Sequence, residues 1–459
     1  PAIVAVAEDR APELLITVDN GISSVEGVQA AKALGWQVII TDHHLPGDEI
    51  PNADVIVNPN QPGCEFPSKA MAGVGVLFYV MMALRVELRR RKWFQQQQLA
   101  EPNLACFLDL VALGTVADVV PLDRINRILV EQGLRRLRAG KCRPGIAALL
   151  ELAGRQPSRL VSADLGFAVG PRLNAAGRLD DMSLGIECLL ASQADAARVL
   201  ASRLDELNQE RKAIEQEMQG DAHLLLQQLQ QLVTDLPCGL CLYDASWHQG
   251  VIGILASRVK ERVHRPVIAF AQVSDEEMKG SARSVAGLHV RDCLDAVAKK
   301  YPGLLTKFGG HAMAAGLSIH IEQFALFRDA FNQQVQQILG DAPMRPEICT
   351  DGKLAALELS MQSAEDIRYA APWGQGFPEP CFDGVFRLVN KRIVGGRHLK
   401  VTLCDQRTNR YHDGIQFNAE TSQDIQSGTE IMVVYRLDIN EYRGQRQLQL
   451  LIDYIEPLT

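Results

Sequence analysis

The chain has 459 residues, which is too long for one ordinary domain and predicts two or three. Its apolar content of 47% can build real cores, and no run of about eighteen apolar residues exists, so we expect no membrane span. A formal charge of −8 argues against a protein coated by nucleic acid, although a local basic groove can coexist with an acidic body. Ten scattered cysteines, and first residues unlike a secretory signal, favour a reducing, cytoplasmic location.

The first predicted unit is a β-α-β arrangement with polar side chains at the ends of both strands. Leu14–Val18 is apolar and stops at Asp19, Val25–Leu34 reads as a helix, and Val38–Ile40 is apolar and stops at Asp42-His43-His44. Such a unit places its strands in parallel, so both strand ends share one edge of the sheet. Carboxylates and imidazoles together suit Mn²⁺, Zn²⁺ or Fe²⁺, and Mg²⁺ where carboxylates and waters dominate. The alternative is that these residues only end strands in solvent.

A third ligand candidate lies in an otherwise apolar segment. Leu110–Leu122 is almost wholly apolar, with Asp118 in its middle. Because a buried carboxylate without a partner is costly, Asp118 needs a cation or hydrogen-bond donors. A role as metal ligand is favoured over that of a simple helix cap, since it fits the predicted cation site.

A long helix is predicted from Ser192 to about Leu232. Its apolar residues follow a three-four spacing on one face: Leu200, Leu204, Leu207, Ile214 and Met218. Charged residues, Arg211 and Glu215 among them, cover much of the rest. A solvated helix with one apolar stripe suits a bridge between two domains.

The sequence on either side of this helix predicts α/β structure, and the end of the chain predicts β structure. Residues 239–339 form the second α/β unit, with strands at Leu240–Tyr243, Val267–Ala271 and Ala314–Ile319 and helices at Gly253–Val263, Val290–Lys300 and Gln323–Leu339. From about Pro343 the segments become short and β-rich, which is typical of a small barrel or sandwich.

Three glycine-containing segments are candidates for binding phosphate. Gly170–Arg178 places two guanidinium groups and an amide on a compact turn, and arginine forks match phosphate oxygens in two-point geometry. Gly280–Ser284 offers hydroxyls beside a guanidinium, and Gly309–Gly316 has adjacent glycines that let backbone amides approach an anion. A surface loop or an ordinary turn would explain each segment alone. Two of them in one domain favour binding of a phosphate backbone there.

The last predicted domain contains a basic segment. Between residues 387 and 410 the only acidic residue is Asp405, against Arg387, Lys391, Arg392, Arg397, Lys400, Arg407 and Arg410. Tyr442, Arg443 and Arg446 add an aromatic ring within a second basic cluster. Proteins that bind single strands combine a basic groove with aromatic rings on which bases stack. The alternative is the charged surface of an ordinary barrel.

Taken together, several motifs resemble the DHH phosphoesterase superfamily, in particular its members that digest single-stranded DNA from the 5′ end in repair and recombination. They are Thr41-Asp42-His43-His44, Gly114–Leu122, Gly170–Arg178, Ser281-Ala282-Arg283-Ser284 and Gly309-Gly310-His311. The resemblance implies four parts: a parallel-sheet DHH domain at 1–190, a connecting helix at 191–233, a smaller α/β DHHA1 domain at 234–340 and an OB-fold β-barrel at 343–459. It also implies a pair of Mg²⁺ or Mn²⁺ ions.

The resemblance also assigns roles to single residues. Asp19 would bridge both ions, His43 and Asp118 would hold one of them, His44 would face the scissile phosphate, and Asp42 would orient the histidines. DNA phosphates would be held by Arg172, Asn174, Arg178, Ser281, Arg283, Gly309, Gly310 and His311. Weaker assignments to single-strand binding fall on Arg392, Arg397, Lys400, Tyr442 and Arg443.

One departure from the superfamily pattern concerns the start of the chain. Members carry an aspartate-rich strand upstream of the Asp19 strand, and eighteen residues are too few to hold that strand and its crossover. We therefore expect the sequence to be an N-terminally truncated form of an active enzyme. The alternatives are a DHH hydrolase of short oligonucleotides, cyclic dinucleotides or pyrophosphate, and an inactive single-strand-binding module. A monomer is expected, with single-stranded DNA, a single-strand-binding protein and a helicase as partners.

Overall fold

The computed structural model describes residues 1–232, 236–340, 347–396, 398–417, 419, 425–442 and 444–458. The chain divides into two compact units. The first contains Pro1–Gly170, Ala191–Ala194 and Cys349–Thr459, and the second contains Pro171–Leu190 and Asp195–Ile348. The predicted domain bounds at 233/234 and at 340/343 fall at residues outside the described ranges, so these bounds stay predictions.

The first unit begins with a small parallel sheet. Strands β1 (Leu14–Val18), β2 (Gln37–Thr41) and β3 (Val55–Val57) pair in the order β1-β2-β3, and Val18 lies opposite Thr41. Helices α1 (Ala2–Glu8) and α2 (Val25–Ala33) cover one face, where Val4, Val28, Ala31, Val38 and Ile40 form a core. The predicted β-α-β arrangement is confirmed, and the parallel pairing aligns the carboxyl ends of the strands.

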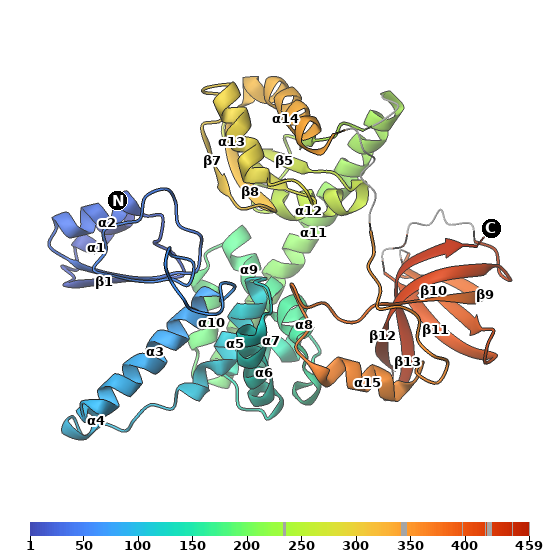
Figure 1. Ribbon diagram of the computed structural model, residues 1–459, viewed down its shortest axis with the longest axis horizontal. Helices are drawn as coiled ribbons and strands as arrows, with labels where there is room; N and C mark the ends of the chain where they lie inside the picture. The colour runs from blue at the N-terminus through green and yellow to red at the C-terminus, as the bar shows by residue number, and fades with distance from the viewer. Residues whose placement is uncertain are drawn as a thin grey trace. The chain divides into compact units, whose positions relative to one another are not determined.

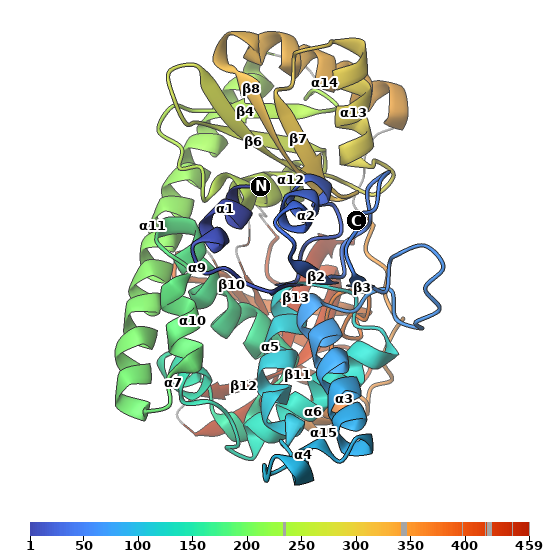
Figure 2. The ribbon, with the colours of Figure 1, turned by 90° about the vertical axis from the view of Figure 1, so that its left-hand side faces the viewer.

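A group of helices follows the sheet in the first unit. Helices α3 (Gly73–Arg90), α5 (Leu108–Ala117) and α6 (Arg124–Arg138) lie side by side (Figure 2). Gly133 allows α5 and α6 to approach closely, because a Cβ at this position would lie 2.3 Å from the Leu108 carbonyl oxygen. The shorter elements are α4 (Trp93–Gln96), η1 (Leu104–Phe107), α7 (Pro144–Leu152), η2 (Pro157–Arg159), α8 (Ser162–Asp164) and the π-helical turn η3 (Leu165–Val169).

The C-terminal part of the first unit is a closed barrel preceded by helix α15 (Met361–Ala370), as Figure 1 shows. Its strand order is β10-β11-β13-β12-β9. A core of buried Phe386, Leu403, Val433 and Leu450 fills it, and closure removes unpaired strand edges. The strand bounds are β9 (Phe382–Val394), β10 (His398–Asp405), β11 (Arg410–Gln416), β12 (Glu430–Tyr442) and β13 (Gln445–Pro457).

The second unit contains a five-stranded mixed sheet and the predicted long helix. The sheet order is β4-β5-β6-β8-β7, and α11 (Ala194–Leu232) spans 39 residues. Strand β5 (Val267–Gln272) is apolar and buried on both faces, because α11 and α12 (Ile252–Val263) cover one face and α13 (Val290–Lys300) and α14 (Phe324–Leu339) cover the other. The remaining elements are α9 (Gly170–Leu179), α10 (Ser183–Leu190), β4 (Leu240–Tyr243), β6 (Glu277–Arg283), β7 (Lys307–Gly310), β8 (Ala314–His320) and η4 (Ile321–Gln323).

The predicted fold class is confirmed: a parallel sheet, a long helix, a second α/β unit and a β-barrel. Strands β6 and β7 were not predicted, because their glycines weaken the apolar alternation that marks a strand. Within the described ranges, no helix is both long and apolar enough to cross a membrane.

Candidate metal centre

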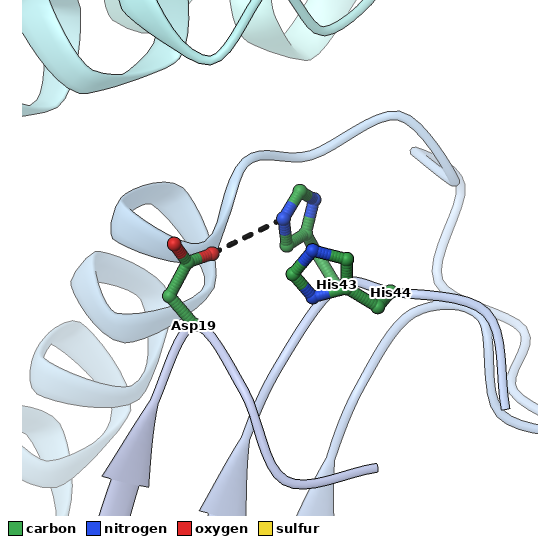
Figure 3. Close-up of side chains that lie close together, drawn as sticks. All are labelled: Asp19, His43 and His44. Atoms are coloured by element: carbon green, nitrogen blue, oxygen red, sulfur yellow. Dashed lines mark ion pairs between the residues drawn. The ribbon is translucent and has the colours of Figure 1, made fainter. Parts of the chain in front are cut away.

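The metal-ligand candidates lie at the carboxyl edge of the small parallel sheet. Asp19 directly follows β1, and Asp42, His43 and His44 directly follow β2. The Asp19 amide donates to the Thr41 carbonyl oxygen at 2.9 Å, which keeps the two chain segments adjacent beyond the strands. Asp19, His43 and His44 point toward one another (Figure 3), and their ligand atoms lie within 4.8 Å of one another.

His43 is the centre of this arrangement. Its Nε2 atom lies 3.1 Å from Asp19 Oδ1 and 3.5 Å from Asp118 Oδ2. The atom is buried, and it makes no hydrogen bond of ordinary geometry to the part of the chain that the structure describes. Buried polar atoms are nearly always paired, so an imidazole nitrogen left open between two carboxylates marks a site for a cation.

The carboxylates also act on the protonation of His43. Burial by itself would lower the pKa of His43. Contact of the ring with the Asp19 side chain and the negative charges of Asp118, Asp19 and Asp42 outweigh burial and raise the pKa of His43 above its ordinary value. The same carboxylates would favour a divalent cation at this position.

Asp42 is a buried acceptor, 1% exposed, beneath the two histidines. It accepts hydrogen bonds from the amides of Ile22 at 2.9 Å and His43 at 2.7 Å, and from the His44 ring Nδ1 at 2.7 Å. Burial would raise the pKa of Asp42, but these donors hold it below its ordinary value, so the carboxylate stays charged. Of the two histidine rings, the Asp42 side chain bonds only that of His44. His43 is held through its backbone amide.

Asp118 reaches the site from a different element. It is the C-cap residue directly after α5, and its side chain is half-exposed, although the apolar sequence around it predicted burial. The prediction differs because the helix ends at Ala117 and the chain turns outward. Desolvation raises the pKa of Asp118, and the like charge of Asp19 adds to this while His43 opposes it. A divalent cation would relieve this repulsion.

The backbone at the site is strained at two positions. Asp19 has a φ of +65° and Val119 a φ of +59°, both in the left-handed region. Asp tolerates this region, but a β-branched residue rarely adopts it. The Val119 side chain is 63% exposed, so burial of this side chain offers little compensation. Strain of this kind, of order 1–3 kcal/mol per residue, is commonly found at functional sites.

Sequence reasoning missed Gly73, the first residue of α3. A Cβ added to Gly73 would lie 2.1 Å from Asp19 Oδ1, so only glycine leaves room for the carboxylate. A glycine opening an apolar helix gives no distinct sequence signal, because its partner is 54 positions away.

Asn58 and Asn60 were also missed as site residues. The Asn58 side chain donates to the His44 carbonyl oxygen at 2.9 Å, and the Asn60 side chain donates to that of His43 at 2.6 Å. These amides fix the backbone of both histidines. The signal was present, since polar residues follow β3 just as they follow β1 and β2.

Asp19, His43 and Asp118 fit a divalent cation. Two carboxylates and an imidazole suit Mn²⁺, and Mg²⁺ when waters complete its shell. The three residues predicted as metal ligands are thus brought together from β1, β2 and α5. Their roles toward a metal stay predictions.

The predicted phosphate-binding residues lie in the second unit or at its border. Gly170–Arg178 forms helix α9 and not a turn, because Leu173, Ala175 and Ala176 give it a buried face. Arg172 is mostly buried and pairs with Asp205 at 2.7 Å, so this guanidinium serves an internal ion pair. Asn174 is exposed on the same helix. Arg178 is also exposed and donates to the Gly250 carbonyl oxygen at 3.0 Å.

The other candidates lie on strands β6 and β7 and in the hairpin between β7 and β8. Ser281 and Arg283 lie on β6, with Arg283 Nη1 3.0 Å from Ser281 Oγ. Gly309 and Gly310 end β7, and exposed His311 begins the tight hairpin to β8, where Ala314 lies opposite Arg283. The hairpin therefore lies at the Arg283 end of β6.

In the barrel, Arg392 and Lys400 are neighbours across β9 and β10. Arg392 is exposed, whereas Lys400 pairs with Asp413 at 3.1 Å. Arg397 and Arg443 lie outside the described residues, as does the side chain of Tyr442. Single-strand binding by this surface stays a prediction.

The fold and the site together define a class of protein. Residues 1–115 match the DHH family N-terminal domain, residues 231–337 match the DHHA1 domain, and residues 350–454 match the RecJ OB domain. With Asp-His-His at the end of β2, these matches place the chain in the DHH phosphoesterase superfamily.

Similar sequences and structures narrow this class. The chain is 57% identical to the single-stranded-DNA-specific exonuclease RecJ of Salmonella typhimurium, over 100% of this chain and 80% of that protein. It is 55% identical to the Escherichia coli protein of that name, with the same coverage. A crystal structure of Thermus thermophilus RecJ with Mn²⁺ is 28% identical, with a TM-score of 0.80 over 99% of this chain and 63% of that one. The chain therefore belongs to the RecJ family.

Gly73→Ala tests the space around Asp19. We expect the new methyl group to displace the carboxylate and weaken Mn²⁺ binding by at least about tenfold, while the fold is kept. Calorimetric titration with Mn²⁺ measures this. Gly220→Ala is the matched control, because a Cβ there meets nothing within 4 Å. Unchanged Mn²⁺ affinity in Gly73→Ala would show that the Asp19 carboxylate is not a ligand.

The raised pKa of His43 predicts the pH dependence of metal binding. A ligand imidazole must lose its proton, so metal affinity falls as the pH drops through the His43 pKa. Because this pKa lies above the usual 6.5, the loss begins above that pH. Mn²⁺ affinity measured across pH 5 to 9 should fall by about tenfold per pH unit on the acid side. A flat profile across this range would contradict the assignment of His43.

Proposed function

We propose that the chain is a metal-dependent exonuclease that hydrolyses phosphodiester bonds of single-stranded DNA from the 5′ end. The observation that carries this proposal is the buried His43 Nε2, which lies 3.1 Å from the Asp19 carboxylate and 3.5 Å from the Asp118 carboxylate. The RecJ relatives are named as single-stranded-DNA-specific exonucleases, and the Thermus structures hold Mn²⁺ or Mg²⁺. The 5′ polarity rests on the family resemblance alone.

The residues of the chain have separate tasks in this reaction. Asp19, His43 and Asp118 would hold a divalent ion; two such ions, when bound, supply an activated water and neutralise charge on the phosphoryl group. Charged Asp42 accepts from Nδ1 of His44 and fixes that ring. We propose that His44, oriented in this way, faces the scissile phosphate.

We assign recognition of the DNA strand to residues that lie outside the carboxyl edge of the small parallel sheet. Arg178, Ser281 and Arg283 offer two guanidinium groups and a hydroxyl to phosphate oxygens, a geometry that favours two-point contacts. The barrel has the strand order of an OB fold, a module that binds extended single strands. Both features favour a long polynucleotide over a dinucleotide.

The size of the substrate separates this proposal from a DHH hydrolase of small molecules. Rates on a long 5′-phosphorylated DNA strand, a dinucleotide and pyrophosphate are compared under the same conditions with Mn²⁺. The proposal expects the long strand to be degraded fastest. Faster cleavage of the dinucleotide or pyrophosphate would instead support a DHH hydrolase of small molecules. Binding of the long strand without turnover would support an inactive single-strand-binding module.

Asp19→Asn tests the metal-dependent chemistry. Asn keeps the size and tolerates the left-handed backbone of Asp19, so the fold should survive. Loss of the carboxylate should lower the rate of DNA cleavage by about a thousandfold or more, since a ligand charge is removed. Asp48→Asn, at an exposed position in the segment between β2 and β3, is the control. Cleavage by Asp19→Asn at the rate of the unaltered protein would reject the proposed function.

We also propose a cytoplasmic location, where thiols stay reduced, because all ten cysteines are free. A monomer is proposed, with a single-strand-binding protein and a helicase as partners. These proposals rest on the family resemblance and on cysteine usage. Size-exclusion chromatography with light scattering tests the monomer.

A further inference from the structure

The connecting helix α11 has a buried polar segment in the middle of its apolar stripe. Beside buried Leu207, its buried positions recur every three or four residues: Ala197, Ala201, Leu204, Asn208, Arg211, Glu215, Met218, Ala222 and Leu226. Three consecutive members of this stripe are polar. Arg211 and Glu215 were predicted to be solvated, but each is 8% exposed, and Asn208 is 1% exposed.

The three side chains form one network. Arg211 Nη1 donates to Glu215 Oε2 at 2.8 Å, and Nη2 donates to Asn208 Oδ1 at 3.1 Å. Arg211 Nε is buried and has no hydrogen-bond partner among the described residues. Glu215 also accepts from Arg258 on α12, at 3.4 Å. The network therefore links α11 to α12, two helices of the second unit whose apolar side chains pack in one core.

Helix α12 connects this network to the proposed phosphate ligands. Arg178 donates to the carbonyl oxygen of Gly250, just before the helix begins. Arg283 Nε donates to Ser257 Oγ on the helix at 3.2 Å. A Cβ on Gly253, in its first turn, would lie 2.9 Å from Arg283 Nη2. Arg283 and Glu215 thus contact α12, and Arg178 contacts the chain two residues before it.

Positive charge accumulates around α12. Partial loss of hydration lowers the pKa of the Arg178 side chain, and the charge of Arg211 lowers it further while the charge of Glu215 raises it. Burial likewise lowers the pKa of Arg283, and the charge of Arg178 adds to this. Like charges kept together in a partly desolvated place repel one another, and an anion bound among them removes that repulsion.

Stability does not explain the polar segment. A buried ion pair commonly contributes no more than apolar side chains of the same volume, and often less. Apolar residues at 208, 211 and 215 would continue the stripe without a gap. The buried network is therefore better explained by a task at the anion site than by folding.

We propose that Arg211 is a positioning residue for nucleic-acid phosphate. Arg211 is held by Asn208 and Glu215, and it keeps Glu215 in place to accept from Arg258. This contact ties α11 to α12, the helix that carries the cluster of Arg178 and Arg283. Arg211 itself stays buried and does not contact the strand. This inference rests on the proposed function and deepens it, because it brings the connecting helix into substrate binding.

The test separates binding from stability with the double substitution Arg211→Met/Glu215→Leu. It removes both charges of the buried pair and keeps an apolar stripe, so the melting temperature should stay the same or rise. Affinity for a long 5′-phosphorylated oligothymidylate, measured by fluorescence anisotropy in EDTA, should fall about tenfold. With Mn²⁺ present, KM should rise by a similar factor while kcat changes little.

Two single substitutions complete the test. Arg211→Lys keeps the charge and should retain most of the affinity, whereas Arg211→Gln should lose it. Arg203→Met is the control, because Arg203 is an exposed arginine on the same helix. Unaltered affinity in the double variant overturns the inference, as does equal loss in Arg211→Lys and Arg211→Gln. If the unaltered protein itself neither binds nor cleaves the strand, the proposed function fails instead.

Discussion

The parallel pairing of β1 with β2 is the constraint on which the site depends. It sets Val18 opposite Thr41, so the residues that follow, Asp19 and Asp42, begin at the same edge of the sheet. Asp42 then folds the next residues back by accepting from their amides, which points His43 toward Asp19. A shift of one residue in this register would turn the side chains to the opposite face and separate the ligands.

The second unit uses charge in a different way. At the sheet edge, carboxylates surround an open imidazole nitrogen and favour a cation. Around α12, guanidinium groups gather and favour an anion. A phosphodiester with divalent ions needs both environments, since the metal neutralises the reacting phosphate and arginines hold its neighbours. The first unit therefore has an edge that favours a cation, and the second unit has a cluster that favours an anion.

The sequence predicted what depends on local pattern. We predicted the apolar runs of β1 and β2, the polar residues that follow them, and the long helix. The hydrophobic period and the length of each segment can be determined from neighbouring residues alone. Contacts between distant residues were not predicted, as with Gly73 beneath Asp19 and the burial of Arg211. The Gly170–Arg178 segment was predicted as a turn because its glycines and proline outweighed the buried face of α9.

Two residues at the proposed metal site have a left-handed backbone: the ligand Asp19 and Val119, which follows Asp118 and is exposed and β-branched. The rest of the fold must hold this geometry against its own preference. Directed evolution for heat resistance alone would therefore tend to replace Val119 by glycine or asparagine. Both residues adopt a left-handed backbone with less strain than valine. Such variants would gain thermal stability from a change directly beside Asp118. Any change in the backbone at residue 119 would also shift the Asp118 carboxylate, a proposed metal ligand.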